Sequence, residues 1–215
     1  MNNHDQSLVA FVLLAASSLF VIMDPIALIP AFLAMTTGDP PAQRARMAAL
    51  ACGVAAGLLV FFALVGDKIF RLFGITLASF KIAGSIVLLL IGLDMLQARR
   101  SLVQETREEK DAGAAKEDIA ITPLAVPMLA GPGAISTAIL LRAQVKDWTQ
   151  EVALLVCIVV VSFLCYLVLR LAARGVGWIS PIAMRIATRI MGLLLVAVAV
   201  QFTLDALAEQ KGKLF

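Results

Sequence analysis

Two proline motifs inside long apolar stretches are the features of this chain best suited to chemistry. The first reads DPIA over residues 24–27, and the second reads GPGA over residues 131–134. Proline has no backbone N–H and is best tolerated at the first position of a helix, so each motif predicts a helix that stops and restarts. A helix N-terminus carries about half a positive charge together with free amides, which suit a carboxylate or another small anion.

Asp24 is the strongest candidate for a functional residue in these motifs. At the centre of a bilayer a carboxylate costs about 2.5–3.5 kcal/mol on insertion scales, so an acidic residue at that depth is a functional candidate. Asp24 can bind a substrate ammonium, bind a cation or carry a proton. The competing structural role is an N-cap that accepts hydrogen bonds from the first amides of the next helix. The two roles are compatible.

The composition places these motifs in a membrane. Of the 215 residues, 61% are apolar and only 15% are charged, against about 25% charged in an ordinary soluble domain. The mean hydropathy is +0.95. The apolar stretches are continuous rather than alternating, which indicates membrane helices and not a β-barrel. This composition excludes a typical cytosolic enzyme, a disordered chain and a disulfide scaffold.

Six apolar runs are each long enough to cross a bilayer, which takes about 20 residues. These predicted spans cover residues 8–34, 46–66, 74–97, 120–142, 151–172 and 182–208. A charged stretch over 98–118 divides them into two groups of three. We therefore predict a first three-helix unit over 1–97, a cytoplasmic linker over 98–118 and a second three-helix unit over 119–215.

The two units look like copies of each other. Pro25 and Pro132 lie 107 positions apart, and the segments KIAG at 81–84 and RIMG at 189–192 lie 108 positions apart. Three is an odd number of spans, so the second copy enters the membrane upside down. The predicted fold is an all-α membrane protein of six transmembrane helices, arranged as two inverted three-helix repeats with helix breaks in spans 1 and 4. Many secondary transporters share this architecture.

The basic residues, the histidine and the cysteines limit which partners and cofactors we expect for the chain. Lys and Arg are more frequent in the loops after the odd-numbered spans, which predicts an inner-membrane protein with both termini in the periplasm. The basic residues form no patch, so no nucleic acid is expected. The lone histidine, His4, rules out a zinc cluster or a histidine-activated serine, and no P-loop is present. We expect that the chain is not an enzyme and that it binds no metal or cofactor. We also expect buried thiols at the three cysteines and a chain that can form a homo-oligomer.

The predicted function is secondary transport of a small polar solute, with a proton or sodium ion as a possible coupling partner. The solute's carboxylate would face the amides at the two helix starts, and Asp24 would meet an ammonium or the coupling ion. Neutral polar side chains would complete the pocket. The predicted substrate-binding residues are Asp24, Pro25, Ala27, Gly131, Pro132, Gly133, Ala134, Ser136 and Gln201.

Four segments resemble signatures of the MarC family of integral membrane proteins, also called UPF0056 or neutral amino acid transporter-like. They read FVIMDPIALIPAFLAMT, FGITLASFKIAGSIVLLLIGLDML, TPLAVPMLAGPGAIST and RIMGLLLVAVAVQF. The resemblance implies that the solute is a neutral amino acid. Many members carry Asn before the first proline, which suits a polar binding or capping role at Asp24. Two alternatives stay open: a non-transporting membrane protein that acts through protein partners, and a small-solute channel.

Overall fold

The computed structural model describes residues 3–36, 38–97, 120–174 and 181–214, and contains helical elements and no strand in these ranges. The predicted linker over 98–118 lies outside them. The elements in chain order are α1 (Asn3–Met23), α2 (Pro25–Met35), α3 (Pro41–Phe73), α4 (Leu77–Gln97), η1 (Ala120–Leu129), α7 (Pro132–Ala143), α8 (Trp148–Arg174) and α9 (Pro181–Leu214).

Several of these elements are long and apolar enough to cross a membrane. Four candidate spans qualify alone: Ser7–Met35, Pro41–Phe73, Leu77–Asp94 and Trp148–Arg174. The bent pair of η1 and α7 makes a fifth. In α9 the apolar part is the shorter segment Gly192–Ala208. The described residues thus form an all-helical membrane protein with four to five candidate spans.

Both predicted helix breaks are present. The α1 helix ends at Met23 and α2 begins at Pro25, and the axes of η1 and α7 differ by 55°. The η1 segment is itself irregular, because Thr122 and Val126 have extended backbone angles. Each of these residues precedes a proline, whose ring disfavours the α conformation in the residue before it. The predicted span over 120–142 is therefore continuous in hydropathy but not in helical geometry.

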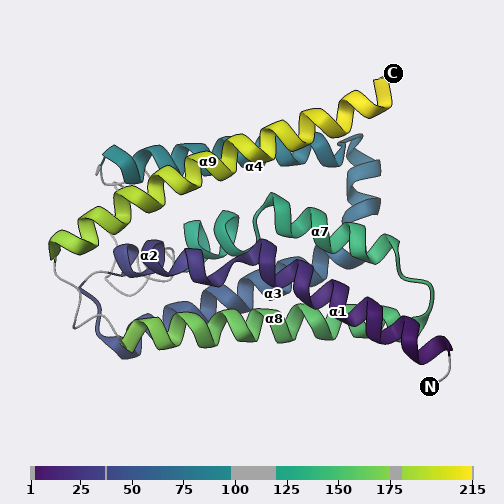
Figure 1. Cartoon of the computed structure of the whole chain (residues 1–215), viewed down its shortest axis with the longest axis horizontal. Coiled ribbons are helices and arrows are strands. Elements are labelled where there is room, and N and C mark those ends of the chain that lie inside the picture. The colour runs from purple at the N-terminus through teal and green to yellow at the C-terminus, as the bar shows by residue number, and fades with distance from the viewer. Residues whose placement is uncertain (1–2, 37, 98–119, 175–180, 215) are drawn as a thin grey trace.

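The helices form two groups with the broken segments between them. In Figure 1, α4 and α9 lie side by side along one edge, and α3 and α8 lie along the opposite edge. The η1–α7 segment packs on α3 and also contacts α4. The α1 helix packs on α8 and α7, and α2 contacts α8 and α9. The two broken segments therefore lie between the α4–α9 pair and the α3–α8 pair.

Small residues set how closely these helices approach. A methyl group added at Gly92 of α4 would lie 2.9 Å from the carbonyl oxygen of Gly192 in α9, so the two backbones are nearly in contact. The same pair of helices shares a 2.7 Å hydrogen bond between the hydroxyls of Ser85 and Thr203. Close approach of this kind and interhelical hydrogen bonds are the forces that associate helices in lipid.

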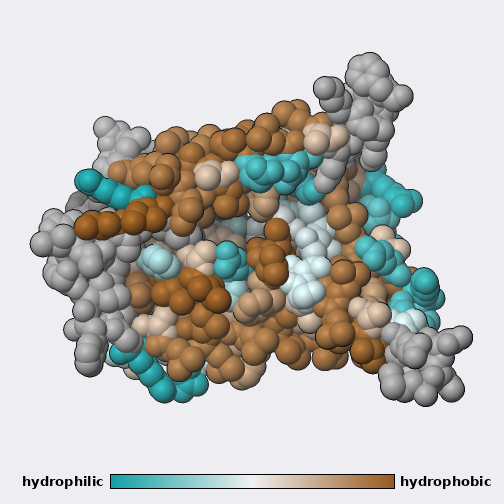
Figure 2. All heavy atoms as spheres, in the orientation of Figure 1, coloured by the Kyte–Doolittle hydropathy of each residue, from teal (hydrophilic) through white to brown (hydrophobic). Residues whose placement is uncertain are grey.

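The outer surface is predominantly apolar, as Figure 2 shows for one face. Large hydrophobic side chains are exposed on every long helix, among them Leu13, Val21, Val159 and Leu193. A soluble protein rarely exposes so much contiguous apolar surface. The three cysteines, Cys52, Cys157 and Cys165, are buried, as the sequence predicts.

The α4–α9 contact predicts the effect of filling Gly92. Gly92→Leu should lower the free energy of unfolding by about 1–3 kcal/mol, because the side chain would overpack against the α9 backbone. Gly57→Leu in α3 is the matched control, since a side chain there meets nothing within 4 Å. Thermal unfolding of the two purified variants in detergent measures the difference. Equal melting temperatures would contradict the close approach of α4 and α9.

Candidate substrate site at two helix breaks

The first break is built around Asp24, whose φ of 37° places it in the left-handed region. Its Oδ1 accepts a hydrogen bond from the Ala27 N–H at 3.1 Å, as an N-cap does. Pro25 occupies the first position of α2, where no N–H is required. The Ile26 N–H has no acceptor recorded in the described part of the chain. The free amide at this break is therefore that of Ile26, since the Ala27 amide is already engaged.

The second break leaves more backbone groups open. Gly131 is the N-cap of α7 and makes no side-chain cap, and Pro132 follows at the first helical position. The Gly131 carbonyl accepts from the Ile135 N–H at 3.0 Å, which starts the helical pattern. Among the described residues, no acceptor is recorded for the N–H groups of Gly133 and Ala134. This helix start therefore presents two free donors.

The two breaks are in contact with each other. A methyl group added at Gly133 would lie 3.2 Å from Cγ1 and Cδ1 of Ile22, which is two residues before Asp24. It would also lie 2.6 Å from Cζ of Phe202 in α9. Only a glycine leaves room for this approach, so the start of α7 meets the end of α1 beneath the Phe202 ring.

A second glycine fixes the position of Pro132. A methyl group at Gly84 of α4 would overlap Cγ of Pro132, so the proline ring rests directly on the α4 backbone. This contact links the second break to the α4–α9 pair. The segment KIAG at 81–84, which marks the repeat in the sequence, thus also contacts the second break through Gly84.

Two predicted polar residues have different surroundings. Ser136, one turn into α7, is 1% exposed, and its hydroxyl has no hydrogen-bond partner. Buried hydroxyls usually have a partner, so an unpaired one beside two free amides is compatible with a polar ligand or water. Gln201 is exposed on α9 and donates to the Asp205 carboxylate at 2.7 Å. No hydrogen bond between Gln201 and the two breaks is recorded in the described ranges.

The two breaks differ in burial. The residues Gly131, Pro132, Gly133 and Ala134 are buried, whereas Asp24 is exposed and Ala27 is half-buried. Figure 2 shows pale and hydrophilic residues in the hollow between the apolar surface of α9 and that of α1 and α2. The arrangement therefore presents an exposed carboxylate at the first break and buried free amides at the second.

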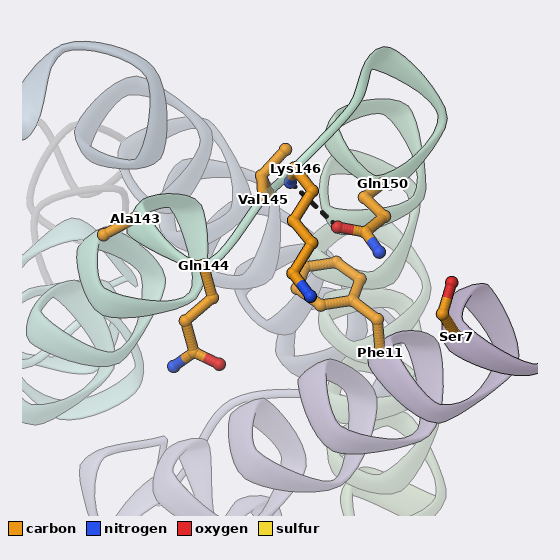
Figure 3. Close-up of a pocket in the computed structure, with 7 residues that line it drawn as sticks. All are labelled: Ser7, Phe11, Ala143, Gln144, Val145, Lys146 and Gln150. Atoms are coloured by element: carbon orange, nitrogen blue, oxygen red, sulfur yellow. Dashed lines mark hydrogen bonds between the residues drawn. The ribbon is translucent and has the colours of Figure 1, made fainter. Parts of the chain in front are cut away.

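A separate pocket of about 490 Å³ lies at the end of the molecule near the N-terminus (Figure 3). Residues of α1 and of the loop between α7 and α8 form it: Ser7, Phe11, Ala143, Gln144, Val145, Lys146 and Gln150. None of these residues belongs to the predicted substrate site.

The sequence places the chain among membrane proteins of one family. A family model described as MarC family integral membrane protein matches residues 9–210. The chain belongs to the MarC family. It is 36% identical over 197 residues to UPF0056 membrane protein MJ1677 of Methanocaldococcus jannaschii, covering 92% of this chain and 96% of that protein.

Other curated relatives of this MarC chain carry the same family designation. It is 36% identical to a UPF0056 membrane protein of Aquifex aeolicus, with 88% of this chain and 89% of the relative covered. It is 32% identical to UPF0056 membrane protein YhcE of Escherichia coli, with 86% of each chain covered. No solved structure matches the chain. The matched region includes both helix breaks.

Three residues at the breaks were not predicted from the sequence. Ile22 and Phe202 are apolar residues within apolar runs, and nothing in their type marks them as neighbours of Gly133. The free amide of Ile26 becomes apparent only when the Asp24 hydrogen bond to Ala27 is known. The sequence signal that could have drawn attention to Phe202 was its position directly after Gln201, a predicted substrate-binding residue in the sixth predicted span.

The capping geometry predicts how Asp24 tolerates replacement. Asp24→Asn should leave stability nearly unchanged, because Asn caps helices and adopts left-handed backbone angles readily. Asp24→Ala should lower the free energy of unfolding by about 2 kcal/mol, since it loses the cap and keeps the unfavourable φ. Chemical unfolding of both variants in detergent measures this. Equal losses in the two variants would contradict an N-cap in this conformation.

Proposed function

We propose that the chain is a secondary transporter of a neutral amino acid across the bacterial inner membrane. The supporting observation is the contact between two interrupted helices, made by Gly133 at the start of α7 and Ile22 at the end of α1. Broken helices of this kind carry the substrate sites of many transporters, because their N-terminal amides bind anionic groups. Amides that lack an acceptor at a buried helix start suit a polar ligand, which favours a carrier over a membrane protein that acts only through partners.

We also propose six transmembrane spans arranged as two inverted repeats, with both termini in the periplasm. The packing is consistent with a twofold relation between the halves. Equivalent helices pair with each other, as α3 does with α8 and α4 with α9. The first segment of each half packs on the second helix of the other half, α1 on α8 and η1 on α3. The second segments α2 and α7 contact α9 and α4 in the same way.

The site suits the two charges of an amino acid. The carboxylate would accept hydrogen bonds from the amides of Ile26, Gly133 and Ala134, with the hydroxyl of Ser136 beside them. The ammonium, or a coupling proton or sodium ion, would meet the Asp24 carboxylate. Because Asp24 already accepts from Ala27, it is oriented before the solute arrives. The Phe202 ring covers the α7 start and must move for a solute to reach Gly133.

A flux assay tests the proposal. Protein in proteoliposomes should transport one or more of radiolabelled leucine, alanine, serine and glutamine, with rates that depend on a proton or sodium gradient. Asp24→Ala should abolish this flux, whereas Asp24→Asn should retain flux with a KM about tenfold higher, because the amide keeps the cap but loses the charge. Asp67→Ala is the control, since Asp67 is exposed and pairs with Arg71 away from the breaks.

Two results would oppose the proposal. Undiminished flux in folded Asp24→Ala would remove the role assigned to Asp24. Absence of flux for the whole panel under every gradient, in protein whose melting temperature shows it to be folded, would contradict amino acid transport itself.

A further inference from the structure

We propose that the pocket beside Lys146 is a second binding site, which takes small solutes that carry a carboxylate next to an apolar body. The inference deepens the proposed function, on which it rests for the identity of the natural solute. The site would hold the solute at the membrane surface before it reaches the helix breaks. The volume of about 490 Å³ lies within the range of small-molecule sites, which is roughly 300–1,000 Å³.

The lining combines one cation with neutral groups. Phe11 and Val145 supply apolar surface, and Ser7, Gln144 and Gln150 supply neutral polar groups. In Figure 3 the Lys146 side chain extends from the loop into the space between Gln144 and Phe11. None of the seven lining residues is acidic. Lys146 is therefore the charged residue of this lining, and its ammonium suits an anionic group.

Two carboxylates near the pocket whose side chains the structure describes, those of Glu151 and Asp147, have other partners. Glu151 is paired with Arg142 at 2.8 Å. The Asp147 carboxylate accepts from the Gln150 N–H at 2.9 Å and so caps the first turn of α8. No ion pair is recorded for Lys146 in the ranges that the structure describes. Its ammonium is thus the charge available to an incoming carboxylate.

Two of the lining residues, Gln150 and Phe11, are held in place. Gln150 is only 4% exposed, and its Oε1 accepts from the Lys146 N–H at 2.9 Å. Phe11 is 8% exposed and forms part of the wall from α1. The loop that carries Lys146 is therefore tied to the start of α8 on one side and faces α1 on the other. A pre-formed site loses little freedom when a ligand binds.

The pocket and the breaks lie along the same two helices. The α1 and α7 helices meet at Ile22 and Gly133, and Phe11 of α1 and Gln144, the C-cap of α7, both line the pocket. Ile22 lies eleven positions after Phe11 in α1, which is about 16 Å of helix. A solute released from the pocket would therefore start at one end of the α1–α7 contact and find the free amides at the other.

Intrinsic fluorescence can report occupancy, because Trp148 lies two residues from Lys146 and is 74% exposed. The chain has two tryptophans, and Trp178→Phe removes the other, which lies outside the described residues. This protein in phosphatidylcholine nanodiscs would be titrated at low salt with leucine, isovalerate and leucinamide. Leucine and isovalerate should give a saturable change in Trp148 emission, whereas leucinamide should give none because it lacks the carboxylate.

Variants assign the response to the pocket. Lys146→Gln should raise the half-saturating concentration about tenfold, and the difference should shrink at high salt as the charge is screened. Lys68→Gln, an exposed lysine of α3 outside the pocket, should change nothing. In flux assays Lys146→Gln should raise KM and leave maximal flux unaltered. Absence of a saturable response to both carboxylates, or equal half-saturation in Lys146→Gln, would overturn the proposal.

The two proposals fail in different ways. Asp24→Ala should lose flux and keep the Trp148 titration, because Asp24 lies at the breaks and not in the pocket. If the Trp178→Phe protein, with no other substitution, shows the titration but carries no solute, the transport proposal fails and the carboxylate site stands. If flux depends on Asp24 and the titration is absent, the transport proposal stands and the pocket proposal fails.

Discussion

A backbone N–H inside a bilayer must find a hydrogen-bond partner, and this requirement determines how the two helix breaks are built. Water is absent from the hydrocarbon region, so an unsatisfied amide there costs several kcal/mol. At the first break the Asp24 carboxylate takes the Ala27 amide, and the left-handed backbone of Asp24 allows this. At the second break Gly131 offers no side chain, so the amides of Gly133 and Ala134 are left for a ligand or water.

The surrounding packing keeps these amides in one place. Pro132 rests on Gly84, and Gly133 lies against Ile22 and Phe202, so a side chain at either glycine would displace the start of α7. The Ser85–Thr203 hydrogen bond and the Gly92 contact join α4 to α9 behind the site. The α4–α9 pair thus acts as the support on which the second break is positioned.

Much of the fold follows from the sequence, because hydropathy and proline sterics act locally. Helices of the structure overlap the predicted spans, four to five of which qualify as candidate membrane spans. Pro25 and Pro132 stand where helices begin. Irregularity in η1 could also have been inferred, since Thr122 and Val126 each precede a proline. The contacts of Gly133 could not, because they join α1, α7 and α9 across the bundle.

The sequence predicted the two helix breaks of the candidate site, but not which backbone amides are free at them or which partners the polar side chains have. The break motifs identify where amides become free, but the side-chain hydrogen bond of Asp24 decides that Ile26 rather than Ala27 is open. Gln201 was placed near the solute by type alone, and the structure gives it Asp205 as a partner. The Lys146 pocket was missed because its two sides come from distant parts of the chain.

Cross-linking of the two breaks tests their convergence most directly. In a chain whose Cys52, Cys157 and Cys165 are replaced by Ser, and whose Phe202 is replaced by Ala to make room for a side chain at position 133, Ile22→Cys and Gly133→Cys should form a disulfide rapidly on mild oxidation in membranes, and a transported amino acid should slow it. The control pair uses Val21→Cys in place of Ile22→Cys, because Val21 is 73% exposed. Cross-linking of the Ile22 pair no faster than that of the control, with no effect of any amino acid, would contradict a shared site at the two helix starts.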